Sequence, residues 1–402
     1  MLVKDQLNRV IGLPLLTLYG LGTILGAGIY VLIGKVIGVA GIYAPIAFGL
    51  AAAIAAITAL SYADLVARFP KSGGEAIYLL AAFKSRLLSG IIGYLVAFAG
   101  IVSAATIANG FVGYLKQYTI LSNEVVIIVL LTSLTALAIW GIAQSLWVTA
   151  IITIVEIIGL LIVLFINRNN LTTVNMTTHF VPASLSDIVG ILGGAFLAFY
   201  AYIGFEDMVN IVEEVKEPQK NMKRAIWISI IIATTLYLLI SLVAVNSGDD
   251  LKAISQSDAP LVMLTEQHNN KAALLLSMIS LFAITNGALV QIIMSSRMFY
   301  GMSSEKIGPL FLSTINKFTK TPINATLVAG LLATILALWF PLIFLAKLTS
   351  FVVLLIFTLV NIALCKIKYS NKERFILPSI AAILCLLLIL FQIISLIEIS
   401  PH

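Results

Sequence analysis

The sequence has little charge, few histidines and almost no cysteine. Only 10% of its 402 residues are Asp, Glu, Lys or Arg, whereas a soluble globular domain carries about 25%. Cys365 and Cys385 both lie in apolar runs, so they are most simply small buried residues and not a disulfide or metal pair. His179, His268 and His402 fall at or beyond the ends of apolar runs, and no HExxH motif occurs. These absences argue against a soluble domain and against a membrane-embedded enzyme.

The sequence instead contains many long hydrophobic runs. Hydrophobic residues make up 60% of the chain, and the mean hydropathy is +1.08. A helix needs about 20 apolar residues to cross a hydrocarbon layer about 30 Å thick. Eleven runs meet this requirement, near residues 12–34, 38–66, 86–115, 123–141, 146–166, 187–213, 223–246, 270–300, 325–345, 347–366 and 375–397. We therefore expect an all-α integral membrane protein in which residues 1–402 form a single transmembrane domain within the lipid bilayer.

The distribution of Lys and Arg predicts the orientation. The net charge is +6, but in a membrane protein basic residues mark cytoplasmic loops, so this balance requires no nucleic acid partner. With the N-terminus inside, eighteen basic residues lie on the cytoplasmic side and six outside, the six being Lys35, Lys116, Arg168, Lys252, Lys271 and Lys347. Eleven spans then place the C-terminus outside the cytoplasmic membrane. The oligomeric state stays open.

Two of the predicted spans have interrupted patterns. The first contains Gly20, Gly22, Gly26 and Gly28, each of which weakens a helix by up to about 1 kcal/mol relative to Ala. The spacing of Gly22 and Gly26 also suits close helix packing. The sixth span carries a glycine and two carboxylates in its sequence FYAYIGFEDM, from Phe199. Interrupted helices at matching positions in two five-helix halves are typical of inverted-repeat transporters. The halves are about 12–166 and 187–366, with an extra helix at about 375–397.

The expected helix ends at these interruptions predict a binding site. In the first span the outer half-helix should begin near Ala27, which directs the backbone N–H groups of Ala27, Gly28 and Ile29 into the membrane as an anion site. The inner half should end near Ile24. The outer half of the sixth span should end near Tyr200, Ala201 and Ile203. Unpaired carbonyls at those two ends suit an ammonium group. A carboxylate site beside an ammonium site predicts an amino acid as substrate.

Glu206 and Asp207 begin the inner half of the sixth span. Negative side chains there complement a helix N-terminus, so both carboxylates have capping as an alternative to a functional role. Glu206, closer to the interruption, is also a candidate contact for a substrate amine. An amine or polyamine substrate would use the carbonyls and Glu206 without the amides of residues 27–29.

Three further polar positions lie within predicted spans. In the fifth span, Thr149, Thr153 and Glu156 share one helical face, and an intramembrane carboxyl group is a candidate for proton coupling. The alternative is a protonated side chain hydrogen-bonded to a neighbouring helix. In the eighth span, Thr285 and Asn286 could line the cavity or form interhelical hydrogen bonds.

Several stretches together resemble the amino acid, polyamine and organocation (APC) superfamily, over about residues 10–366. They are GLGTILGAGIYVLIG from Gly20, YADLVARFPKSGGEAIY from Tyr62, FYAYIGFEDMVNIVEEVKEPQKNMKRAI from Phe199 and SSRMFYGMSSEKIGP from Ser295. Within the superfamily, the sequence is most similar to bacterial and archaeal amino acid permeases related to cationic amino acid transporters.

The resemblance implies the leucine-transporter type of 5+5 inverted-repeat fold, alternating access and the substrate contacts given above. It also implies a coupling position in the fifth span that faces Gly22 and the eighth span. Proton-coupled relatives often have lysine there, whereas this sequence has Glu156. The chain also has eleven expected spans where twelve are usual, and Lys223 stands where the loop motif normally has proline.

The sequence thus predicts a secondary transporter that moves an amino acid across the cytoplasmic membrane with protons. It is expected to need no cofactor or metal, and sodium stays open as the coupling ion. The alternatives are an amine or polyamine transporter, an amino acid exchanger, and a sensor that binds without transport. The cytoplasmic stretches from Tyr62 and Glu213 are expected to be gates or fixed loops whose charges are solvated or meet lipid head groups.

Overall fold

The computed structural model describes residues 9–26, 28–71, 73–116, 118–140, 146–172, 181–248, 250–319 and 321–399. Within them the regular structure is helical, apart from one isolated bridge. The α-helices are α1 Leu13–Leu25, α2 Gly28–Ala40, α3 Ala44–Arg68, α4 Gly74–Phe83, α5 Arg86–Leu115, α6 Asn123–Trp140, α7 Leu146–Ile166, α8 Asn169–Thr172, α10 Leu185–Ala198, α11 Pro218–Val245, α12 Leu251–Gln256, α13 Pro260–Glu266, α14 Asn270–Ser304, α15 Ile323–Trp339, α16 Leu342–Ser370 and α17 Ile376–Ile399. Four 3₁₀ segments complete the fold: η1 Gly41–Tyr43, η2 Phe199–Tyr202, η3 Phe205–Glu214 and η4 Leu310–Ser313.

The described helices include nine candidate membrane-spanning segments. The first of these runs from Leu13 to Arg68 and contains 56 residues, which is long enough for two crossings at 1.5 Å per residue. The apolar helix α15 is shorter, at 17 residues. The expectation of an all-α multi-pass membrane protein is therefore confirmed.

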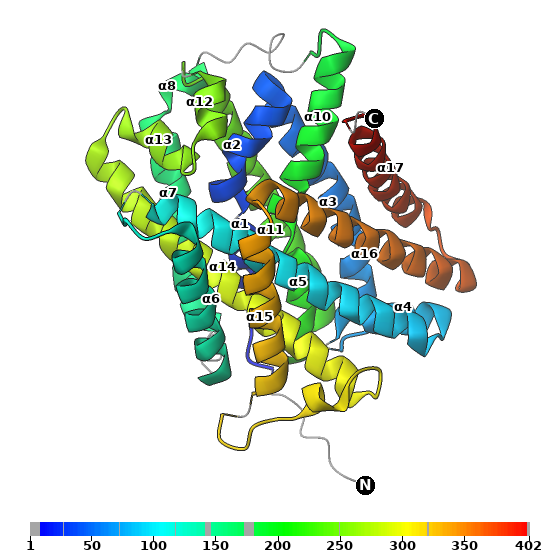
Figure 1. The fold of residues 1–402 in the computed structure, drawn as a ribbon. Coiled ribbons are helices and arrows are strands. Elements are labelled where there is room, and N and C mark those ends of the chain that lie inside the picture. The colour runs from blue at the N-terminus through cyan, green and yellow to red at the C-terminus, as the bar shows by residue number, and fades with distance from the viewer. Residues whose placement is uncertain are drawn as a thin grey trace.

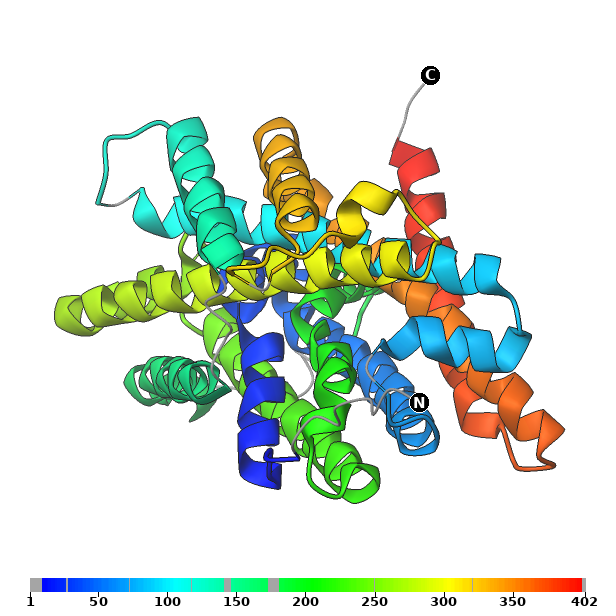
Figure 2. The same ribbon diagram turned by 90° about the horizontal axis from the view of Figure 1, so that it is seen from below.

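The long helices form one bundle (Figure 1). α1 packs against α7 and α11, α10 packs against α2 and α3, and α14 packs against α5. Seen from below, α14 runs across the bundle, while α6, α15 and α17 lie at its periphery (Figure 2). The residues at the two interruptions are buried, among them Ile24, Leu25, Tyr200 and Tyr202.

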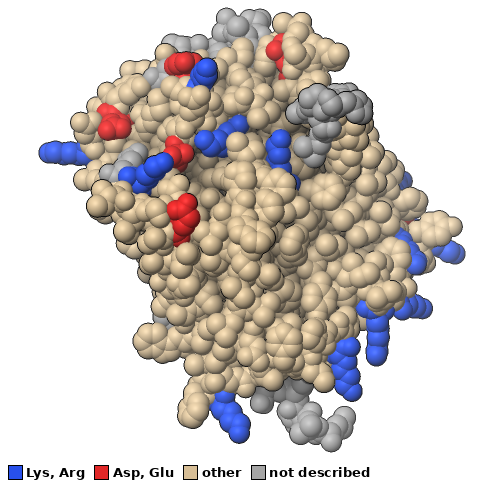
Figure 3. All heavy atoms as spheres, in the orientation of Figure 1, with Lys and Arg blue, Asp and Glu red and all other residues tan. Residues whose placement is uncertain are grey.

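The surface has the character expected of a membrane protein. On the face in Figure 3, charged side chains gather toward the two ends of the bundle and leave a broad uncharged band between them. Large apolar side chains are exposed along α7, among them Ile151, Leu161 and Phe165. Exposed apolar surface on this scale is stable against lipid and not against water.

Both expected interruptions occur. α1 ends at Leu25 and α2 begins at Gly28, while the sixth span changes from α10 through η2 to η3 at Ile203 and Gly204. The segment before α1 is tied to the end of η3, because the N–H groups of Val10 and Ile11 both donate to the carbonyl of Glu214. The two interrupted segments are therefore joined at one end of the bundle.

One predicted helix boundary and one expectation about solvent exposure are wrong. The predicted ninth span ended at residue 345, but α15 ends at Trp339 and α16 begins at Leu342, with Pro341 as its N-cap. Proline disrupts a helix interior and favours the start of a helix, so the turn falls there. The charges of the stretch from Tyr62 are not all solvated either, because Glu75 on α4 is only 2% exposed.

Candidate functional site

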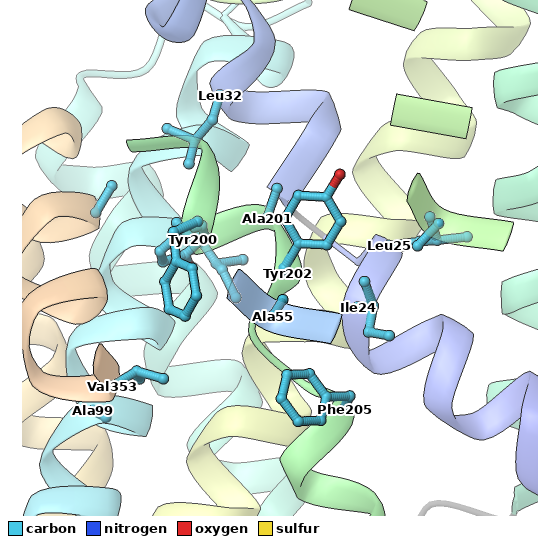
Figure 4. Close-up of a cluster of buried hydrophobic side chains, with 14 of the residues drawn as sticks. Ile24, Leu25, Leu32, Ala55, Ala99, Tyr200, Ala201, Tyr202, Phe205 and Val353 are labelled. Atoms are coloured by element: carbon cyan, nitrogen blue, oxygen red, sulfur yellow. The ribbon is translucent and has the colours of Figure 1, made fainter. Parts of the chain in front are cut away.

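The first interruption faces the second across a very short distance. A Cβ atom added to Gly28 would lie 2.5 Å from Cα and 2.8 Å from Cβ of Ala201. Figure 4 shows Ile24 and Leu25 at the end of α1 beside Ala201 and Tyr202. Ala27, the third predicted amide donor, lies outside the described residues. Glycine at position 28 is what allows the N-terminus of α2 to touch the η2 backbone.

The second interruption depends on the backbone of Gly204. Ile203 is extended, with φ −68° and ψ 138°, and Gly204 has φ +127°. A Cβ atom at Gly204 would overlap the backbone carbonyl of Thr23 and lie 3.1 Å from the nitrogen of Ile24. Only glycine combines that φ with so close an approach, so the two breaks fit into one another.

Tyr237 of α11 bridges the two interruptions. Its hydroxyl lies 2.9 Å from the carbonyl oxygen of Ile24 and 2.9 Å from that of Ala201. These two carbonyls were predicted to be unpaired, and that part of the prediction is wrong, because each accepts from Tyr237. One hydroxyl has one hydrogen to share between two acceptors, so the carbonyl pair keeps capacity for a further donor.

A small cavity lies at the meeting point. Its lining comprises Gly22, Thr23, Ile24, Gly26, Gly28, Ser103, Ile107, Tyr200, Ile203, Gly287, Val290 and Gln291. The cavity has a volume of about 20 Å³. About 10–15 Å³ is enough for one water molecule. The structure therefore brings together five predicted residues, Gly22, Ile24, Gly28, Tyr200 and Ile203. Ala201 and Ile29 are buried beside them and do not line this cavity.

A second cavity adjoins the first and shares three of its lining residues, Ser103, Ile203 and Gln291. The volume of this second cavity is about 30 Å³. Its other lining residues are Glu75, Val96, Ala99, Gly100, Glu206, Asp207, Thr349, Val353, Ile356 and Phe357. Three carboxyl groups thus lie next to the break, where the sequence indicated two.

Glu206 and Asp207 both lie in the first turn of η3 and are 9% exposed. The backbone N–H of Gly204 donates to Glu206 Oε2 at 2.8 Å, so the capping role considered for this residue is observed. The Asp207 carboxylate is 3.4 Å from the side-chain nitrogen of Gln291. Both side chains line the second cavity, so capping and a role at the site are compatible.

Glu156 is completely buried on α7. In the described part of the chain neither of its carboxyl oxygens has a hydrogen-bond partner, although its backbone carbonyl accepts from the Tyr30 hydroxyl at 2.7 Å. Thr149 and Thr153 of the same face are buried, as the helical periodicity predicts. Thr153 lies directly against Gly22, where a Cβ atom would overlap its hydroxyl. The α7 face that carries Glu156 therefore packs on α1 near the first interruption.

Thr285 and Asn286 lie on α14 and were considered either as cavity-lining residues or as partners in interhelical hydrogen bonds. The Thr285 hydroxyl donates to the carbonyl of Leu281 on its own helix, and Asn286 is 8% exposed. Neither lines the two cavities, whose α14 residues are Gly287, Val290 and Gln291.

The sequence reasoning missed Tyr237, Ser103, Gln291 and Glu75. Ser103 shares a hydrogen bond of 2.9 Å with the hydroxyl of Tyr200. Gln291 was detectable as a polar residue within an apolar run, whereas a serine or tyrosine in a span carries no such signal. Glu75 was misread because it lies in a polar stretch. No cluster of metal-ligating side chains occurs among the described residues.

Comparison with known proteins agrees with a multi-pass membrane protein. The sequence is 27% identical to the branched-chain amino acid permease BcaP of Bacillus subtilis, over 96% of this chain and 89% of the relative. It is 26% identical to the methylthioribose transporter of Bacillus subtilis, over 95% and 88%.

A plant relative is the mitochondrial cationic amino acid transporter 3 of Arabidopsis thaliana, which is 27% identical over 91% of this chain. The match spans 63% of that relative's length. The profile of the amino acid permease family matches residues 11–400. The chain therefore belongs to the amino acid permease family.

Proposed function

We propose that this protein is a secondary active transporter that moves an amino acid across the cytoplasmic membrane by alternating access, with protons as the coupling ion. The observation that carries the proposal is the meeting of the two interrupted helices at one cavity. There the N-terminus of α2 begins at Gly28, and the carbonyls of Ile24 and Tyr200 lie at the ends of α1 and η2.

The chemistry of the helix ends favours a zwitterion. The amides at Gly28 and Ile29 offer a carboxylate the positive end of the α2 dipole. The carbonyl ends of α1 and η2 offer acceptors to an amine, which would displace or share the Tyr237 hydroxyl. The names of the relatives, which include cationic and branched-chain amino acid transporters, support an amino acid but leave the side chain open.

The proposed topology has eleven crossings. Nine candidate segments supply ten when Leu13–Arg68 is divided between α1–α2 and α3, and α15 supplies the eleventh at about 26 Å. The distribution of basic residues then places the N-terminus in the cytoplasm and the C-terminus outside. In this scheme α1–α7 and α10–α16 are the two inverted repeats, and α17 is the extra helix.

Uptake into proteoliposomes tests the proposal. A panel of labelled amino acids is offered with an inward proton gradient, then without it, and with sodium replaced by potassium. We expect gradient-stimulated accumulation of one class of amino acid and no effect of sodium. Methyl esters should compete poorly with the free acids. Esters that bind as tightly as acids would favour an amine substrate, and uptake that needs internal amino acid at every pH would favour an exchanger.

A further inference from the structure

Glu75 directly follows a turn formed by two glycines with positive φ, and this turn places its side chain inside the bundle. Gly73 has φ +116° and Gly74 has φ +40°, so the chain turns sharply into α4. A Cβ atom at Gly74 would lie 2.8 Å from Cγ2 of Val209 on η3. The start of α4 therefore rests directly on the inner half of the sixth span, which places Glu75 at the second cavity.

The carboxyl group of Glu75 is only partly satisfied. Its Oε1 atom accepts a hydrogen bond of 2.9 Å from the Tyr62 hydroxyl of α3. Its Oε2 atom has no hydrogen-bond partner in the described part of the chain, although the residue is 2% exposed and lines the cavity. Leaving such a buried atom without a hydrogen-bond partner is unfavourable. The cavity has room for a water molecule beside it.

The groups around Glu75 are acidic or neutral. Glu206 and Asp207 line the same cavity from η3, and the hydroxyls of Tyr62 and Tyr78 are its other titratable neighbours. α5, α14 and α16 contribute only uncharged residues, and no Lys, Arg or His belongs to the described lining. Like charges confined to one small cavity oppose one another.

Burial increases the affinity of the Glu75 carboxylate for a proton. Desolvation raises the pKa of its carboxyl group, and the hydrogen bond from Tyr62 offsets part of that rise. In an open conformation, water would reach the group and its pKa would fall toward the ordinary value. The closed conformation therefore binds more protons than the open one. By linkage, acid stabilises the closed conformation and rising pH favours opening.

We propose that Glu75, Glu206 and Asp207 form a proton-binding site that holds α4 against η3, and that release of its proton opens this end of the cavity. The proposal rests on the proposed transport function, in whose topology α4 lies on the cytoplasmic side. The site would make the cytoplasmic gate responsive to internal pH. It is separate from Glu156, which lies on α7 against α1 and lines neither cavity.

Cysteine accessibility in the purified full-length protein tests the site without requiring transport. Cys365→Ser and Cys385→Ala remove the native thiols, and Ala99→Cys places a reporter in the cavity lining. The rate of modification by a small methanethiosulfonate reagent is measured from about pH 5.5 to about pH 8.5, around the range where a raised carboxyl pKa falls. Each rate is divided by that of an exposed cysteine at Ser370→Cys, which corrects for thiol ionisation.

We expect the corrected rate to rise with pH, by up to about tenfold per unit where one proton is released. Glu75→Gln keeps an acceptor for Tyr62 but cannot ionise, so its rate should change less than about twofold over the range. Glu75→Asp, which restores an ionisable group, should restore the pH dependence. Glu305→Gln, the same change at an exposed position, should behave as the parent protein.

A pH dependence that survives Glu75→Gln would overturn the site, even if amino acid uptake is normal. Its loss in that variant and return in Glu75→Asp would support the site, even if no amino acid is transported. A corrected rate that follows sodium concentration at constant pH would also overturn it, because the cavity would then bind a metal cation.

Discussion

Replacing Gly204 with alanine should separate the two interrupted helices. The new side chain meets two obstacles, since φ is +127° and the Cβ atom would overlap the Thr23 carbonyl. A strained backbone conformation costs about 1–3 kcal/mol, and overpacking costs about 1–3 kcal/mol. Because neither neighbour is a flexible side chain, we expect a total of about 2–6 kcal/mol, expressed as lost stability and lost substrate affinity.

Gly28→Ala isolates the second of these costs. Its Cβ atom would lie 2.5 Å from Cα of Ala201, but no unfavourable φ is involved. We therefore expect about 1–3 kcal/mol for Gly28→Ala, less than for Gly204→Ala. Because a factor of ten corresponds to about 1.4 kcal/mol, affinity should fall roughly 5-fold to 150-fold if the whole cost appears in binding.

Gly301→Ala on α14 is the matched control, because a Cβ atom there would meet nothing within 4 Å. It should leave binding unchanged and raise stability by up to about 1 kcal/mol. The assay is thermal unfolding of purified protein in detergent, with and without the transported amino acid. If Gly204→Ala and Gly301→Ala give the same melting temperature and the same ligand-induced shift, the contact between the breaks is not what organises the site.

Three further perturbations address other parts of the structure. Glu156→Gln should abolish accumulation driven by a proton gradient but retain exchange, and unchanged gradient-driven uptake would exclude the coupling role. Tyr237→Phe removes the donor to two break carbonyls, so the free energy of unfolding should fall by about 1–3 kcal/mol, measured by chemical denaturation; an unchanged value would mean that water replaces the hydroxyl. Arg68 donates two hydrogen bonds to the carboxylate of Glu373 and thereby lowers the pKa of Glu373. The ion pair therefore stabilises the fold fully above the ordinary glutamate pKa, and this stabilisation is lost as pH falls through the lowered pKa. Arg68→Gln should remove that acid-sensitive component from melting curves recorded between about pH 3 and about pH 6, whereas curves that match the parent would show that the exposed pair contributes nothing.

The helix interruptions could be predicted because the local sequence determines them. Glycine has no Cβ atom, so Gly28 and Gly204 mark places where the backbone must approach another segment or adopt a positive φ. The predicted end of α1 near Ile24 and start of α2 near Ala27 each lie one residue from the observed ends. Buried positions on α7 followed equally well from helical periodicity.

The partners of those interruptions could not be predicted in the same way. Tyr237 reaches the carbonyl of Ile24 across 213 positions of sequence, and no local pattern encodes that contact. On α14 the polar pair Thr285 and Asn286 did not indicate which face lines the cavities, because the rotation of a helix that is apolar nearly all round is set by its packing on α5. Glu75 depended on the turn at Gly73, whose effect appears only when α4 meets η3.

The size of the cavities has a mechanistic consequence. About 20 Å³ beside the breaks and about 30 Å³ beside the carboxylates hold one or two water molecules each. An amino acid is larger than these volumes, so the proposed transport requires the lining of the first cavity to move outward when the substrate binds. Because Ser103, Ile203 and Gln291 line both cavities, such a movement would also reach the acidic cavity. Ile203 directly precedes Gly204 and η3, against which the start of α4 packs, so this segment would connect the proposed substrate site with Glu75.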